Sequence, residues 1–205
     1  MAQDDGEDRS CARLPPASDR TNSGSSPGVV TPVFPAGVSV LSGFTGQLEV
    51  SFTFRAGWCR LALRVGAEAA AYRATSIEDD FFTDLVEAVA RIASGAIVAS
   101  VLWGDEPGGV FLDIARSGPD HASIVVHQLG LPDWLTPADP PWAPVRGDAL
   151  VMARLPMVTF LTAFAEAFSA VQQSAPEGRI PGWGGEFPAA AFANLRRELG
   201  KRRSF

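Results

Sequence analysis

The sequence has few of the residues on which enzyme and metal chemistry most often depend. Its 205 residues include only two cysteines and two histidines. Cys11 lies in a polar N-terminal stretch and Cys59 in a predicted strand, so we expect no disulfide between them and a reduced, cytoplasmic chain. His121 and His127 lie in one predicted strand, about 20 Å apart by strand rise, which is too far to share a metal ion. No metal site and no cofactor are therefore expected.

Longer signals are missing as well. No apolar run approaches the roughly 20 residues that cross a bilayer as a helix, so we expect no membrane association. The acidic, polar N-terminus lacks the basic start and apolar centre of a signal peptide, which disfavours export. A Gly-x-Ser-x-Gly elbow, a phosphate-binding loop and a dinucleotide fingerprint are all absent, and Cys59 alternates into the core as a small hydrophobic residue. The sequence therefore predicts a protein that is not an enzyme.

Charge also limits the choice of partner. The chain carries 17 basic and 23 acidic side chains, a formal net charge of −6. An acidic body does not attract a phosphate backbone, so nucleic acid is not an expected partner. The basic end, Arg196 to Arg203, is interpreted as a helix end whose cations complement the helix dipole, followed by a basic tail over 200–205.

What is present predicts one folded domain. With 46% apolar residues, the chain can bury roughly two-thirds of its unfolded surface in a single core. Residues 1–28 are almost without apolar side chains and are expected to be disordered, which leaves 29–199 as the domain. Val38 and Val40 are candidates for a weak edge strand.

Alternating apolar and polar residues indicate most of the strands. Phe52 and Phe54 alternate with polar residues in 48–55, and the turn Ala56-Gly57 leads to a hairpin partner with the same alternation. The alanine-rich third strand could instead begin the following helix early. The predicted strands are 48–55, 58–65, 68–74, 97–103, 110–116, 121–129 and 149–154.

Three helices follow from residues at helical spacing. Thr75 and Ser76 are candidate caps of a helix over 77–93, which Gly95 ends. Its predicted apolar side consists of Phe81, Leu85, Ala88, Val89 and Ile92. The helix over 157–173 carries a predicted core stripe of Phe160, Leu161, Phe164, Phe168 and Val171, and a short C-terminal helix runs from 188 to 199. The predicted fold is α+β: an antiparallel sheet of about six to eight strands, two amphipathic helices on one face, and the C-terminal helix closing one end.

Two surfaces can be considered for function. Asp80, Asp84 and Glu87 lie on the polar side of the first helix, where Glu87 can also pair with Arg91. Asp105 and Glu106 lie in the turn of Trp103-Gly-Asp-Glu-Pro-Gly-Gly109, where turn formation is a simpler explanation than acid–base catalysis. The proline-rich connection Gly130–Gly147 contains Trp134 and Trp142, which could pack as an ordered loop or close over a ligand.

Several of these motifs occur together in a bacterial family of small α+β proteins. The motifs are Asp79-Asp80 with Asp84 to Val89 and Gly95, the Trp103–Gly109 turn, Pro156 four residues before Phe160, and Trp183-Gly184 with Phe187-Pro188 and Leu195. Over residues 48–199 the chain resembles that family, some of whose members are associated with toxin–immunity neighbourhoods. The resemblance implies a structural role for the motifs and no catalysis. The chain differs in its proline-rich loop and N-terminal tail.

Two hypotheses follow. The first is a protein-binding domain, most concretely an immunity-type inhibitor, that presents Asp80, Asp84, Glu87, Asp105 and Glu106 to a basic partner such as a toxin domain. On spacing alone, the favoured explanation is that these acids simply keep a helix soluble. The second is a small-ligand binder or enzyme that uses the Trp134–Trp142 loop.

Overall fold

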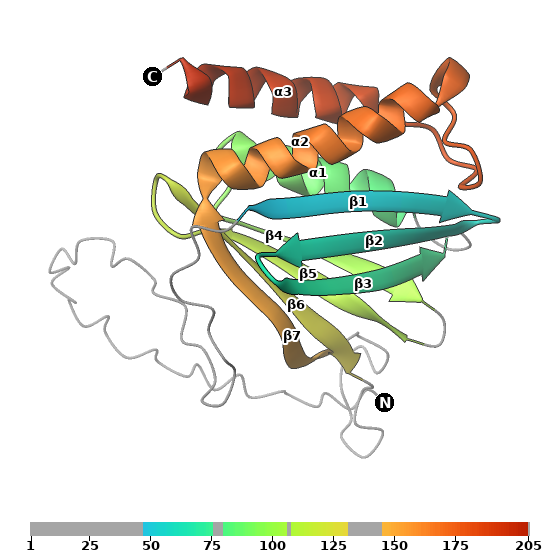
Figure 1. Ribbon diagram of the computed structural model, residues 1–205, viewed down its shortest axis with the longest axis horizontal. Coiled ribbons are helices and arrows are strands. Elements are labelled where there is room, and N and C mark those ends of the chain that lie inside the picture. The colour runs from blue at the N-terminus through green and yellow to red at the C-terminus, as the bar shows by residue number, and fades with distance from the viewer. Residues whose placement is uncertain (1–46, 76–79, 106–107, 131–144, 205) are drawn as a thin grey trace, which may run out of the picture. The chain divides into compact units, whose positions relative to one another are not determined.

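Seven strands, three α-helices and one 3₁₀ turn make up the part of the chain that the structure describes, residues 47–75, 80–105, 108–130 and 145–204 (Figure 1). The structure is a computed structural model, and all described residues belong to one compact unit, Phe34–Phe205. The strands are β1 (Leu48–Arg55), β2 (Trp58–Val65), β3 (Glu68–Thr75), β4 (Val98–Asp105), β5 (Gly108–Arg116), β6 (His121–Gly130) and β7 (Val145–Pro156). The helical elements are α1 (Phe81–Ala93), α2 (Met157–Ser174), η1 (Pro176–Gly178) and α3 (Ala189–Arg203).

The strands form two antiparallel sheets, β1-β2-β3 and β4-β5-β6-β7, each in chain order. The α+β class and the antiparallel pairing are confirmed, whereas the expectation of one sheet of six to eight strands is wrong. β3 and β4 lie next to each other, and Arg73 Nε contacts Asp105 Oδ2 at 3.3 Å, but no backbone ladder joins the two strands. Within each sheet the strands are joined without an intervening helix, whereas the path from β3 to β4 runs through α1, so no hairpin turn sets a register between them.

Two predicted turns form as expected. Ala56 and Gly57 both have positive φ, 49° and 81°, which is the backbone of a two-residue turn that matches the twist of a hairpin. The Gly57 N–H donates to the Gly182 carbonyl at 2.7 Å, which ties this hairpin to the loop before α3. The turn at residues 117–120 is closed by the Ser117 N–H donating to the His121 carbonyl at 3.0 Å.

The tryptophan-containing turn is fixed by close packing. Trp103 belongs to β4 and is fully buried. A Cβ at Gly104 would lie 2.8 Å from the Phe81 ring, and one at Gly109, where φ is +142°, would lie 2.5 Å from the Trp103 carbonyl oxygen. Both positions therefore need glycine for a steric reason, which supports the structural interpretation of this motif. Glu106 and Pro107 lie outside the described residues.

The first helix begins later than predicted. Thr75 is the last residue of β3, so it does not cap α1, and Ser76 lies outside the described residues. The N-cap is Asp80, whose Oδ1 accepts from the Thr83 N–H at 3.1 Å. Gly95, with φ of +115°, ends the helix as predicted.

The helices lie together on one side of the strands (Figure 1). α1 packs against β4 and α2 against β1, while α3 packs on both α1 and α2. The C-terminal helix therefore packs as an outer layer over the other two helices, whereas it was expected to close one end of their layer. It is also not short, since it has 15 residues against 13 in α1 and includes Gly200 to Arg203, which the sequence assigned to a tail.

Because α3 covers part of α1, α1 is buried on a second side. The five residues of its predicted apolar side are all buried, as expected. Phe82, Val86, Ala90 and Ala93 are buried as well, although they were not in the predicted set. A helix covered by sheets on one side and by another helix elsewhere needs apolar residues over more of its circumference.

The predicted stripe of α2 is confirmed as core. Phe160, Leu161, Phe164 and Phe168 are fully buried, and Val171 is 5% exposed. The phenylalanine rings follow one another along the helix, with centroids 4.9 Å apart for Phe160 and Phe164 and 5.7 Å apart for Phe164 and Phe168. Such contacts combine hydrophobic burial with favourable ring geometry.

The strand before α2 is longer than predicted, beginning at Val145 instead of 149 and ending at Pro156. Two irregularities interrupt its pairing with β6 near His127. Other predictions concern the N-terminal segment 1–28, the strand around Val38 and Val40, and the loop tryptophans Trp134 and Trp142, all of which lie outside the described residues. Among the described helices, none has the length and apolar content required to cross a membrane.

The α2 stripe gives a direct test of the core. Phe164→Ala should lower the free energy of unfolding by about 3–5 kcal/mol, because it removes a fully buried ring between two others. Val158→Ala, at a 40% exposed position of the same helix, should cost less than about 1 kcal/mol. Denaturant unfolding measures both, and a loss below about 1 kcal/mol for Phe164→Ala would show that the stripe is not part of the core.

Candidate functional site

Asp80 has a structural role in addition to its charge. Its Oδ1 accepts from the Trp183 indole N–H at 3.2 Å and its Oδ2 from the Thr83 hydroxyl at 2.7 Å, besides the capping bond from the Thr83 amide. The donors of these three bonds are all neutral groups, and Asp80 lies at the exposed start of α1. Trp183 is only 3% exposed, and its edge packs on the Phe54 ring.

The two other acids of α1 project from its exposed side. Asp84 and Glu87 are both exposed, one turn apart along the helix. Glu87 does not form the predicted ion pair with Arg91. Instead, both residues line a groove of about 560 Å³ between α1 and α3, together with Ser94 and Asn194. Three of the predicted partner-binding carboxylates thus remain on one side of α1.

Asp105 is engaged in an ion pair instead. Its carboxylate contacts Arg73 at the junction of the two sheets, and its side chain is only 24% exposed. Its charge is therefore balanced by the arginine. Glu106, the other acid of this predicted pair, lies outside the described residues.

The single described cysteine is inert in this fold. Cys59 is fully buried and free. Burial, with a smaller contribution from the Asp80 charge, raises the pKa of the Cys59 thiol far above its usual range. A thiol that stays protonated is neither a nucleophile nor a ready metal ligand, which agrees with its predicted role as a small hydrophobic residue.

A polar cluster that no local sequence pattern indicates lies on the outward face of the four-stranded sheet. Asp113 of β5 accepts from Arg146 Nε at 2.6 Å, Arg146 Nη2 at 2.8 Å and the Ser100 hydroxyl at 2.6 Å. His127 Nε2 lies 3.6 Å from Asp113 Oδ2, and the Arg146 guanidinium lies 4.6 Å from the centre of the Phe111 ring. Asp113 and Arg146 are 33 residues apart, so only the strand register brings them together.

The electrostatics of this cluster favour a charged pair. Partial burial alone would raise the pKa of Asp113, but hydrogen bonds from Arg146 and Ser100 and the charges of Arg146 and His127 outweigh burial and lower it. The hydrogen bond to Asp113 raises the pKa of Arg146. Asp113 therefore stays ionised, and its hydrogen bonds hold β4, β5 and β7 together.

The same geometry does not assemble a nucleophile with a base. The Ser100 hydroxyl donates to Asp113, and His127 has Nδ1 3.3 Å from the Gly147 carbonyl, so serine and histidine do not engage each other. Within the described ranges, no group of three or more histidine, cysteine, aspartate and glutamate residues could hold a metal ion.

Removing the Asp113 carboxylate tests whether its hydrogen bonds and ion pair stabilise the sheet. Asp113→Asn should cost about 1–2 kcal/mol near neutral pH, a value reduced because Arg146 is partly exposed. Because the folded pKa of Asp113 lies below its ordinary 3.8, its stabilisation is complete above that value and is lost as the pH falls through the lower folded pKa. Urea unfolding from pH 3 to pH 7, with exposed Asp148→Asn as control, should show the wild-type advantage shrinking in acid. An advantage that is the same at both ends would contradict the assignment.

Two features of the described surface are therefore relevant to function, the acidic side of α1 and the ion-paired cluster around Asp113. The cluster is satisfied within the chain, whereas the carboxylate of Asp80 has only neutral partners and that of Glu87 is exposed. Compared with known proteins, the chain matches no family model, no curated protein and no solved structure.

Proposed function

We propose that this chain is a cytoplasmic, non-catalytic protein-binding domain, most concretely an immunity-type inhibitor of a basic partner such as a toxin domain. The observation that supports it is the acidic side of α1, where Asp80, Asp84 and Glu87 carry negative charge at intervals of one turn. The sequence resemblance to a family with members in toxin–immunity neighbourhoods gives the proposal its concrete form.

The stability of α1 alone does not account for all three of these acids. Acids in the first turn interact favourably with the helix dipole, which accounts for Asp80 and Asp84. Glu87 lies further along, and like charges one turn apart destabilise a helix. Glu87 lies one turn from Asp84 and one turn from Arg91 and makes no ion pair among the described residues, so its charge is available to a cation on another molecule.

The groove beside Glu87 adds shape to this charge. It runs between α1 and α3 and is lined by Ala90, Ala96 and Ala191 as well as by polar residues. Small side chains leave room for a side chain of the partner, and the Asn194 amide, which donates to the Ser94 hydroxyl at 3.1 Å, fixes one wall. A lysine or arginine of the partner could lay its aliphatic part on the alanines and reach Glu87.

The alternative, a ligand-binding or enzymatic role for the Trp134–Trp142 loop, has no comparable support. The loop lies outside the described residues, and the polar cluster nearest its end, at Arg146, is internally satisfied. Protein binding is therefore the function that the described side chains support best.

Co-expression with the product of the adjacent gene tests the proposal. If that product is a toxin, the wild-type chain should restore growth of the host and co-elute with the toxin in size-exclusion chromatography. Asp84→Lys combined with Glu87→Lys should lower the affinity by about tenfold or more, because two attractive contacts become repulsive.

A matched control separates this surface from net charge. Asp148→Lys with Glu166→Lys makes the same change of charge at exposed positions of β7 and α2 and should leave rescue and complex formation unchanged. Thermal melts of both variants verify folding. Absence of any complex with the wild-type chain, or equal loss in both double variants, would rule the proposal out.

A further inference from the structure

The outward face of the three-stranded sheet is basic, although the chain as a whole is acidic. Alternate residues of β1, β2 and β3 point away from the core. Among those whose side chains the structure describes, the charged members are Arg55, Arg60, Arg64, Arg73 and one acid, Glu49. The chain as a whole carries a formal charge of −6. The concentration of arginine on this face is therefore a local feature.

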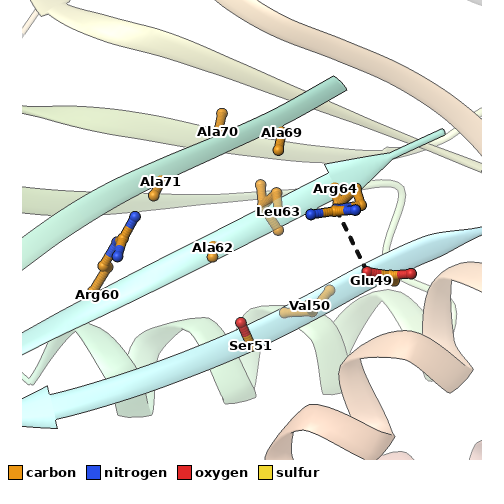
Figure 2. Close-up of a pocket in the computed structure, with 10 residues that line it drawn as sticks. All are labelled: Glu49, Val50, Ser51, Arg60, Ala62, Leu63, Arg64, Ala69, Ala70 and Ala71. Carbon is orange, nitrogen blue, oxygen red and sulfur yellow. Dashed lines mark ion pairs between the residues drawn. The ribbon is translucent and has the colours of Figure 1, made fainter. Parts of the chain in front are cut away.

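A shallow depression lies in the middle of these arginines. It has a volume of about 480 Å³ and a floor of small side chains contributed by all three strands, Ser51, Ala62, Ala69 and Ala71. Figure 2 shows Arg60 and Arg64 on β2 on either side of Ala62. Arg64 is four positions after Arg60 on the strand, which places their backbones about 13 Å apart by strand rise.

The register places two of the arginines against each other. Arg60 is directly opposite Arg73 across the β2–β3 ladder, and like charges in this position destabilise a sheet. Arg73 is held away by other contacts, since its guanidinium lies 5.1 Å from the centre of the Trp58 ring and contacts Asp105. Arg60 has no such partner among the described residues, and it is exposed.

The remaining contact on this face is weak. Arg64 lies 3.6 Å from Glu49, and the two side chains are 60% and 58% exposed. An ion pair in that much solvent adds little to stability and is easily exchanged for another. Arg60 and Arg64 are thus both available to an incoming anion, and neither is required for the fold.

We propose that this face, with Arg60 and Arg64 on either side of the alanine floor, binds an acidic peptide segment of a partner protein. Carboxylates of the segment accept hydrogen bonds from the guanidinium groups, which match carboxylate geometry in pairs. The floor of the depression accepts aliphatic parts of the same segment. This surface lies on the sheet and is distinct from the acidic side of α1.

The observations favour a peptide over a nucleic acid. A single strand of nucleic acid binds along a continuous basic groove, and its phosphates beyond the depression would meet an acidic protein. The arginine face spans only three strands, about 10 Å from β1 to β3, which is enough for a few residues of peptide. A short acidic segment needs no more than this area.

Fluorescence anisotropy with labelled octaglutamate tests the proposal at low salt on the full chain. The wild-type protein should bind the peptide, and Arg60→Glu with Arg64→Glu should weaken binding by about tenfold or more. Arg154→Glu with Arg179→Glu, which changes the net charge equally at exposed positions of β7 and of the segment after η1, should change it by no more than about twofold. Octathymidylate serves as the nucleic-acid probe and should bind more weakly than the peptide.

A stability readout distinguishes a binding role from a structural one. Arg60→Glu alone removes the like-charge contact with Arg73, so its Tm should equal or exceed that of the wild type while peptide binding falls. Should the double reversal fail to fold, Arg60→Gln with Arg64→Gln replaces it and should still weaken binding. The proposal is overturned if the wild type does not bind octaglutamate, if both double variants lose binding equally, or if octathymidylate binds more tightly.

Discussion

The cohesion between the two sheets depends on aromatic packing, since no backbone ladder connects them. Phe82 of α1 is fully buried at the centre of that packing. Its ring centroid lies 5.2 Å from Phe52 and 5.3 Å from Phe54 of β1, 5.8 Å from Phe168 of α2 and 6.2 Å from Phe187 before α3. Three of these neighbours are met edge to face or nearly so, which is the favourable geometry for aromatic rings. One side chain thus joins β1 to all the helical layers, while α1 itself packs on β4.

Local patterns of the sequence predict the elements of this fold well and their assembly less well. The alternation in Leu48–Arg55 and the phenylalanine spacing of α2 identify their elements, because side-chain period is a local property. Asp80 was assigned to a binding surface only, since the indole of Trp183 that it holds is 103 residues away. Phe82 was missed because nothing local shows that β1 and α2 also pack against α1. The Asp113–Arg146 pair likewise exists only through the register of three strands.

The charged side chains fall into groups with different degrees of internal pairing. Asp113 and Arg146 satisfy each other and stabilise the sheet. Glu87 on α1 and Arg60 on β2 remain exposed, with like charges nearby that the fold tolerates at a cost. Natural proteins often retain such locally unfavourable charges at surfaces that contact other molecules. The opposite signs of the two exposed groups suit two different partner surfaces, or two parts of one partner.

Native-state hydrogen exchange tests most directly whether the aromatic junction makes the two sheets one cooperative unit. The slowest amides of β2 and of β5 should report the same free energy of opening in the wild-type chain. In Phe82→Ala both should fall together, because the junction supports both sheets. Opening free energies that differ by more than about 2 kcal/mol between β2 and β5, or a loss confined to one sheet in the variant, would contradict this account.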